Sequence, residues 1–231
     1  MPGNRNRLLA SLKPEELSKL SKHLREVPIK QGMLLEERGE RLDLVHFPLS
    51  GMVSLIVEMP EDRAVEVGAV GSEGALGLTV GLGSRVSCIS ALVQVSGTAL
   101  SIPAPRFRTL ASESQHLTDL ILRYNEMQLG QIQQTAACNA LHQVGSRLAR
   151  WLLQTNDKTG EDTIPFTQEF LSKMLGVRRG TVSVVATRFE AAKLIHTARG
   201  EIQILDREGL KREACSCYEY IARHVDRLLP R

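Results

Sequence analysis

The chain has 231 residues, of which 42% are apolar and 24% are charged, and its formal net charge is +3. This is the composition of an ordinary soluble protein, and no stretch approaches the roughly 18 unbroken apolar residues of a membrane-spanning helix, so no membrane partner is expected. The N-terminal stretch MPGNRNRLLASLKPEELSKL lacks the apolar segment and cleavage site of a secretory signal, which leads us to expect a cytoplasmic location.

The N-terminal half predicts one helix followed by a compact β domain. The helix is expected over 13–24, where three leucines share one face and Pro14 suits the first turn. From about 27 to 102, glycines and prolines separate the short β-rich runs LDLVHF, MVSLIVEM, AVEVGAV, ISALVQV and TALSI. This spacing is typical of an antiparallel sandwich or roll.

After Pro105 the pattern becomes helical, and one long helix carries a face of mixed apolar and polar residues. That face consists of Leu117, Ile121, Tyr124, Gln128, Gln131 and Thr135. Such a face could pack on the chain's own roll, but a polar-studded seam on a long helix is also typical of a dimer contact. We expect a homodimer, with the first four residues of that stripe as its dimerisation residues. A break in the helix is expected near Cys138 and Asn139.

Residues 167–183 read TQEFLSKMLGVRRGTVS, which predicts two short helices joined by a tight turn. Thr167 can cap the first helix, and Gly176 suits the left-handed backbone of the turn. The second helix then begins near Arg178 and Arg179 with exposed, polar and cationic residues. A helix-turn-helix uses this arrangement to place a helix N-terminus in the DNA major groove.

The sequence after this motif and the local charge both favour DNA binding. The run KLIHTARGEIQILD predicts a small hairpin with its turn at Arg199 and Gly200, and a hairpin after a helix-turn-helix is typical of a winged helix. Between Thr167 and Gly200 there are six basic and two acidic residues, so the positive charge gathers here. The expected DNA-binding residues are Thr167, Gln168, Arg178, Arg179, Thr181, Ser183 and Thr187.

Nearly the whole chain resembles the cAMP-receptor-protein and fumarate-nitrate-regulator (Crp/Fnr) family of transcription regulators. The match is strongest in TQEFLSKMLGVRRGTVSVVATRFEAAKLI and continues in LLEERGE, VHFPLSG and GSEGALGLTVGLGSR. The resemblance implies an α+β fold: a jelly-roll-like, double-stranded β-roll over 1–110, a long dimerisation helix over 111–138 and a winged helix over 139–231. It also implies double-stranded DNA and RNA polymerase as partners.

The family's base-reading positions are only partly kept. Arg179 coincides with the family's guanine-reading arginine, whereas Gly180 replaces the neighbouring glutamate and Val184 replaces a second base-reading arginine. The resemblance therefore implies a two-fold symmetric DNA site whose sequence differs from that of the family's cAMP receptors.

The family's phosphate-binding segment is also matched in part. Gly74, Gly77 and Arg85 coincide with its glycines and its phosphate-binding arginine, which makes them the candidate effector-binding residues. Ala75 stands where a glutamate holds the ribose hydroxyl, and Glu73 could replace that glutamate only if the loop changed register. Ile132 and Gln133 stand where hydroxyl residues meet the adenine. The sequence therefore identifies no definite cofactor, and we expect a small anionic or nucleotide effector other than cAMP. As an alternative, Arg85 could pair with a carboxylate of the roll.

Metal or haem sensing finds little support in the sequence. The first of the four cysteines is Cys88, whereas the family's iron–sulfur regulators carry a cysteine cluster near the N-terminus. His23, His46 and His116 are isolated from one another, as surface or core histidines usually are. Cys215 and Cys217 lie on a last amphipathic helix, where a packed face is favoured and a thiol sensor is the alternative.

Two other functions compete with a regulator that responds to an effector. The first is a constitutive DNA-binding regulator whose roll has lost ligand control. The second is an enzyme, which we do not expect, because no Ser-His-Asp order, paired carboxylates, metal triad or phosphate-binding glycine motif occurs at a usable spacing.

Overall fold

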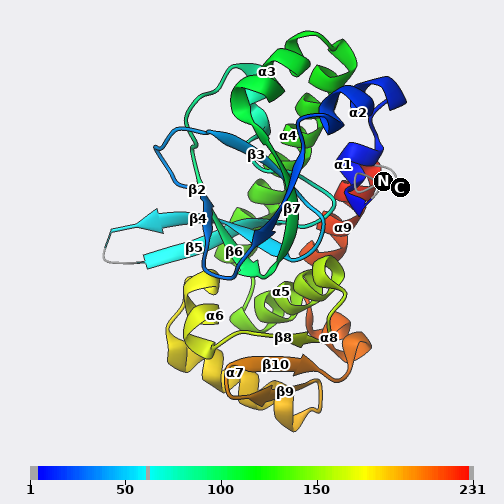
Figure 1. The fold of residues 1–231 in the computed structure, drawn as a ribbon. Helices are drawn as coiled ribbons and strands as arrows, with labels where there is room; N and C mark the ends of the chain where they lie inside the picture. Colours follow the sequence, from blue (N-terminus) through cyan, green and yellow to red (C-terminus); the bar gives the residue numbers. More distant parts are fainter. Residues whose placement is uncertain (1–4, 61–62, 229–231) are drawn as a thin grey trace.

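The computed structural model of the chain describes residues 5–60 and 63–228. A β-roll with a long helix forms one domain, and a smaller helical domain with a short sheet lies below it in Figure 1. Within the described ranges, no helix is long and apolar enough to cross a membrane. The outermost residues of the expected first and last domains, 1–4 and 229–231, lie outside the described residues.

The roll consists of two antiparallel sheets, as expected for a jelly-roll-like domain. Its strands are β1 (Arg25–Ile29), β2 (Leu34–Glu36), β3 (Leu44–Pro48), β4 (Met52–Met59), β5 (Arg63–Val70), β6 (Ser90–Val95) and β7 (Gly97–Pro103). One sheet has the order β1-β7-β3 and the other the order β2-β6-β4-β5. The predicted β runs fall on β3 to β7, which confirms this part of the fold.

Short helices cover the ends of the roll. These are α1 (Arg7–Ala10), α2 (Pro14–Ser21), the 3-10 helix η2 (Leu78–Leu82) and α3 (Ala104–Ser112). The expected helix over 13–24 is present as the shorter α2, because the chain turns into strand β1 at Arg25.

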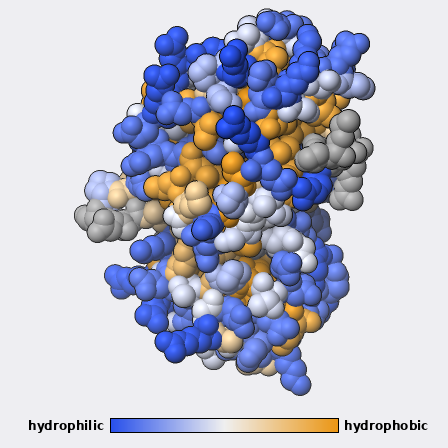
Figure 2. Space-filling view, in the orientation of Figure 1, coloured by the Kyte–Doolittle hydropathy of each residue, from blue (hydrophilic) through white to orange (hydrophobic). Residues whose placement is uncertain are grey.

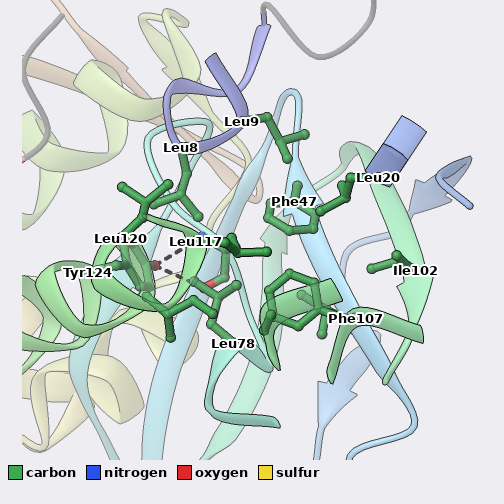
Figure 3. Packing of buried hydrophobic residues seen from close by; sticks show 14 of the residues in the cluster. Leu8, Leu9, Leu20, Phe47, Leu78, Ile102, Phe107, Leu117, Leu120 and Tyr124 are labelled. Carbon is green, nitrogen blue, oxygen red and sulfur yellow. Dashed lines mark hydrogen bonds between the residues drawn. The ribbon is translucent and has the colours of Figure 1, made fainter. Parts of the chain in front are cut away.

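The long helix α4 (Gln115–Leu141) lies against the roll. Leu117, Leu120, Ile121 and Tyr124 are buried in the same core as Phe47, Leu78 and Phe107, and in Figure 3 the labelled members of this set point toward one another. Three of the residues expected at a dimer seam, Leu117, Ile121 and Tyr124, therefore lie inside one protomer. The fourth, Gln128, is half-buried and donates a hydrogen bond from Nε2 to Tyr124 Oη over 2.9 Å.

The helix α4 also runs past its expected break near Cys138 and Asn139. Cys138 is fully buried, so the inner face of α4 continues for another turn. The helix ends at Leu141, and the extended backbone of His142 leads into the next domain.

The C-terminal domain is a winged helix. Its elements are α5 (Val144–Thr159), β8 (Thr163–Ile164), α6 (Gln168–Leu175), α7 (Arg179–Ala191), β9 (Ile195–Ala198), β10 (Glu201–Ile204) and α8 (Arg207–Glu213). The strands form an antiparallel sheet of order β8-β10-β9. Trp151, Phe166 and Phe189 are buried in the core of this domain. Hydrophilic side chains cover most of its surface on the face shown in Figure 2.

The last helix, α9 (Cys217–Leu228), returns from the winged helix to the roll and lies along α4 (Figure 1). Gly130 of α4 permits the close approach, because a Cβ atom there would lie 2.4 Å from His224 Nε2. At the far end of α9, Arg7 Nη2 donates to Asp226 Oδ1 over 3.1 Å. The C-terminal helix thus connects the two domains.

Buried polar contacts also join the domains. Trp151 Nε1 on α5 donates to Glu66 Oε2 on β5 over 3.1 Å, and burial raises the pKa of this carboxyl group. Lys158 at the end of α5 forms a largely buried ion pair with Glu73 in the roll. Because both contacts pair polar groups that are fully or largely buried, they fix α5 against the roll.

Candidate nucleic-acid interface and effector site

The turn between α6 and α7 has the local geometry that its sequence predicts. Thr167 caps α6, and its Oγ1 accepts a hydrogen bond from Phe170 N over 3.1 Å. Gly176 follows α6 with a φ of +63°, a left-handed conformation that glycine adopts without strain. Val177 then packs against the domain core, so the chain enters α7 with its next residues directed to the surface.

The first turn of α7 is exposed and cationic. Arg178 is the N-cap residue, with extended backbone, and Arg179 is the first helical residue. Both are exposed, and neither guanidinium has a hydrogen-bond or ion-pair partner among the described residues. A helix N-terminus already attracts anions, so two free guanidinium groups make this surface well suited to a polyanion.

The other predicted contact residues gather on the same surface, with one partial exception. Thr181 and Thr187 are exposed on α7. Ser183 is half-buried, and its hydroxyl donates to Gln168 Oε1 over 2.6 Å, which joins α6 to α7. Ser183 therefore has a structural contact that the sequence did not reveal. Val184 is 73% exposed, so an apolar side chain stands in the same surface.

A groove of about 400 Å³ lies beside the start of α7. It is lined by Phe166, Thr167, Gln168, Glu169, Arg179, Thr197, Ala198, Gly200, Glu201 and Ile202. The groove thus brings the start of α6, the start of α7 and the β9–β10 wing together. Sequence reasoning predicted the wing but not Thr197 as part of this surface.

The wing is held in place by one glutamate of α7. Glu190 Oε1 accepts hydrogen bonds from Thr197 Oγ1 over 2.7 Å and from Thr197 N over 2.8 Å. These bonds lower the pKa of the Glu190 carboxyl group. The wing and the start of α7 therefore present a single preformed surface.

Comparison with known proteins agrees with this geometry. A protein-family model described as the Crp-like helix-turn-helix domain matches residues 146–213. A CRP-like cAMP-activated global transcriptional regulator from Mycobacterium tuberculosis is 24% identical over 216 residues, which cover 90% of this chain and 96% of that protein. Residues 146–213 thus form a Crp-like helix-turn-helix domain, and over most of its length the chain is similar to a CRP-like transcriptional regulator.

Solved structures share the fold over most of the chain. A Crp/Fnr-family transcriptional regulator from Eubacterium rectale has a TM-score of 0.70 at 17% identity, with 90% of this chain and 98% of that chain covered. FixK2 from Bradyrhizobium japonicum has a TM-score of 0.70 at 12% identity, covering 84% and 98%. The c-di-GMP-responsive regulator CLP from Xanthomonas campestris has a TM-score of 0.67 at 16% identity, covering 83% and 99%.

The expected effector residues Gly74, Gly77 and Arg85 have different surroundings in the roll. Gly74 faces the ring of Tyr124, and a Cβ atom on Gly74 would lie 2.3 Å from Tyr124 Oη. Gly77 has a φ of +74° and approaches the backbone carbonyl of Leu44. Arg85 is exposed and forms no ion pair with the described residues, so the alternative of a pairing with a roll carboxylate is not seen among them.

Tyr124 closes the loop that carries the two glycines. Its hydroxyl donates to Ala75 O over 2.9 Å and accepts from Ala75 N over 3.1 Å. Burial raises the pKa of this hydroxyl far above its usual range, so it remains protonated. The dashed lines at Tyr124 in Figure 3 show how α4 is attached to the loop.

Glu73 does not replace the missing ribose-binding glutamate in this structure. Its carboxylate accepts from Gly71 N over 3.1 Å and pairs with Lys158 of α5. Further along α4, Ile132 is half-buried near Gly68 and Gln133 is exposed. Of the residues that differ from the cAMP-binding pattern, Glu73 and Ile132 therefore contact other parts of the chain, and Gln133 lies in solvent.

Proposed function

We propose that the chain is a Crp/Fnr-family regulator and forms a homodimer in which the two α7 helices read the two halves of a two-fold symmetric operator. The observation that carries the proposal is the exposed start of α7, where the guanidinium groups of Arg178 and Arg179 have no partner among the residues that the structure describes. Arg179 supplies specificity, because a guanidinium can bond guanine O6 and N7 together. Arg178 binds a phosphate and sets the position of the helix.

The exposed face of α4 supports the dimer. Leu122 and Leu129 are 51% and 55% exposed, and exposed Ala136 continues their spacing of seven residues. Two helices with an apolar residue at this interval can pack as a coiled coil. The opposite face of α4 is already buried in the roll, so the exposed stripe is the face that remains for a second copy of the chain.

We further propose that an effector other than cAMP acts through the roll. The relatives from Mycobacterium and Xanthomonas are described as responding to cAMP and to c-di-GMP, which supports control by a small ligand. Ala75 and the occupied carboxylate of Glu73 argue against cAMP, because a buried ribose hydroxyl would lack its acceptor at a cost of about 1–3 kcal/mol. A constitutive regulator is the competing proposal.

Binding of arginine variants to DNA tests the reading head. Duplexes selected from a random pool by the wild-type protein serve as the operator, and a shuffled duplex serves as non-specific DNA. Arg179→Ala should weaken operator binding by about 1–3 kcal/mol per half-site and relax the preference at one base pair. Arg178→Ala should weaken both duplexes alike and reduce the salt slope by about one per subunit.

The control is Arg106→Ala, because Arg106 is an exposed arginine on α3, at the opposite end of the molecule from α7 (Figure 1). This variant should bind both duplexes as the wild type does. If Arg178→Ala and Arg179→Ala also behave like the wild type, α7 is not the reading head.

Titration calorimetry with cAMP tests the effector proposal. We expect weak binding that leaves operator affinity unchanged. A dissociation constant for cAMP in the micromolar range or below, together with an effect of cAMP on operator affinity, would contradict the proposal. Screening other anionic nucleotides in the same operator assay separates an effector-controlled protein from a constitutive one.

A further inference from the structure

Three of the four cysteines meet one histidine at the junction of α4, α5 and α9. The Sγ atoms of Cys138 and Cys215 lie 3.5 Å apart, and Cys217 Sγ lies 3.5 Å from His142 Nδ1. The donor atoms of all four residues lie within 4.8 Å of one another. Among the described residues, this is the one group of three or more potential ligands that could hold a metal ion.

The four residues come from two distant segments of the chain. Cys138 and His142 are one helical turn apart at the end of α4, and Cys215 and Cys217 flank Ser216 where α9 begins. Cys138 and Cys217 are fully buried, Cys215 is 9% exposed and His142 is half-buried. The sulfur atoms are therefore enclosed, which is the setting of a structural metal site and not of a catalytic one with an open position.

The distances fit a single tetrahedral ion. With Zn–S bonds of about 2.3 Å and Zn–N bonds of about 2.0 Å, neighbouring donors in a tetrahedron lie roughly 3.5–3.8 Å apart. Two of the donor pairs are already separated by 3.5 Å. The other donor pairs lie within 4.8 Å, so a small movement of the two pairs toward each other would complete the tetrahedron.

The surroundings of the cluster also suit thiolate ligands. Gln134 Nε2 donates a hydrogen bond to Cys217 Sγ over 3.0 Å, which orients one sulfur and stabilises negative charge on it. The guanidinium of Arg150 is buried, and its Nε has no hydrogen-bond partner among the described residues. Three thiolates and one divalent ion leave one net negative charge, which a nearby buried cation can balance.

We propose that Cys138, His142, Cys215 and Cys217 form a tetrahedral site for Zn²⁺. Thiolate and imidazole donors in a tetrahedral arrangement favour this ion over Mg²⁺, Ca²⁺ or Mn²⁺, which prefer oxygen donors. On binding, each thiol releases its proton to solvent and the neutral imidazole binds through Nδ1.

The ion would tie together the two segments that connect the domains. Cys138 and His142 belong to the end of the long helix, and His142 begins the link to α5. Cys215 and Cys217 lie between the winged helix and α9, which packs along α4. Zinc therefore fixes the winged helix relative to the roll. If α7 reads DNA as proposed above, metal binding also changes operator affinity.

Metal analysis of the full-length protein tests the site. The wild-type chain purified under reducing conditions should contain about one zinc ion per chain. After removal of the zinc by chelation, Co²⁺ should give the visible bands of a tetrahedral ion together with thiolate-to-cobalt charge transfer, and Zn²⁺ should abolish both. Cys138→Ser, Cys215→Ser and Cys217→Ser should lose the zinc, and His142→Ala should lose the tetrahedral cobalt spectrum.

Cys88→Ser is the matched control, because Cys88 is an exposed free cysteine outside the cluster. It should keep the zinc and the cobalt spectrum. Circular dichroism checks that each variant folds. In addition, the melting temperature of the metal-free wild type should rise when Zn²⁺ is added, a readout that needs no substitution. A metal-free wild type that gives no tetrahedral cobalt spectrum and shows no zinc-dependent rise would overturn the proposal.

A redox pair is the competing use of the same residues. If mass spectrometry of the non-reduced wild type finds a disulfide between Cys138 and Cys215 and no bound zinc, the metal site is wrong. Operator affinity measured with and without zinc is a separate readout, for which we expect a change on the order of tenfold. An unchanged affinity in a protein that binds zinc would overturn the coupling and leave the site intact. Loss of DNA binding in both forms would instead contradict the proposed function.

Discussion

At the scale of single residues, His46 combines a titratable side chain with a buried position. It lies on β3 with 5% exposure, and its Nδ1 has no hydrogen-bond partner among the described residues. Burial lowers the pKa of His46 from 6.5 to about 4, because the charged imidazolium cannot be hydrated there. The folded protein thus keeps this imidazole neutral at pH values where the unfolded chain protonates it.

We therefore predict an acid-sensitive stability in the roll. Above pH 6.5 the imidazole is neutral in both states and contributes no pH dependence. As the pH falls from 6.5 to about 4, the unfolded state binds the proton first, so the free energy of unfolding decreases by up to about 3 kcal/mol. Urea unfolding across this range measures the effect. His46→Leu should flatten the curve, and an unchanged slope would show that other groups cause it.

At the scale of secondary-structure elements, the two faces of α4 have different roles. Ile121 is fully buried in the core of the roll, whereas Leu122 and Leu129 are about half exposed on the other side of the helix. A charge placed on the inner face would be buried without a partner, which costs several kcal/mol. A charge on the outer face stays in water within a single protomer.

We predict that Leu122→Glu combined with Leu129→Glu gives a folded monomer, because like charges would meet across the dimer seam. The double variant should unfold in a cooperative thermal transition. Ile121→Glu should not fold stably, because its charge would be buried in the core. Analytical ultracentrifugation gives the oligomeric state. Leu205→Glu is the control, since Leu205 is 53% exposed just after β10 in the winged helix, in a different domain from α4, and this variant should remain a dimer. A dimer in the double variant would place the seam elsewhere.

At the scale of the whole molecule, a buried ion pair connects the winged helix to the roll. Lys158 ends α5 and Glu73 lies in the loop after β5, and their side chains are only 12% and 13% exposed. Such pairs contribute little compared with a well-packed apolar replacement, but removing one partner leaves an uncompensated buried charge. The pair therefore holds the two domains in one relative position more than it raises the free energy of unfolding.

A double-mutant cycle measures this connection. Lys158→Met alone should lower the free energy of unfolding by about 3–5 kcal/mol, because the Glu73 carboxylate loses its counter-charge. The double variant with Glu73→Leu should be more stable than Lys158→Met alone. Chemical denaturation provides both values. If the two substitutions are simply additive, the ion pair does not couple the domains.

The sequence by itself determined the order and type of the main elements. The β runs of the roll, the long helix and the winged helix each carry a local pattern: alternating β residues, helical spacing, or a glycine between two short helices. The exposed start of α7 at Arg178 and Arg179 also follows locally, because Gly176 and Val177 fix the direction in which the chain leaves the turn.

Only the tertiary structure decided which surfaces meet. Both faces of α4 carry apolar residues, and the roll selects the face of Ile121 and Tyr124, so the predicted dimerisation residues lie in the core. Glu73 pairs with Lys158, which is 85 positions away in the chain, and Cys138 contacts Cys215, which is 77 positions away. Periodicity and capping describe interactions between residues close in sequence, whereas these contacts depend on how whole elements pack, which no local pattern encodes.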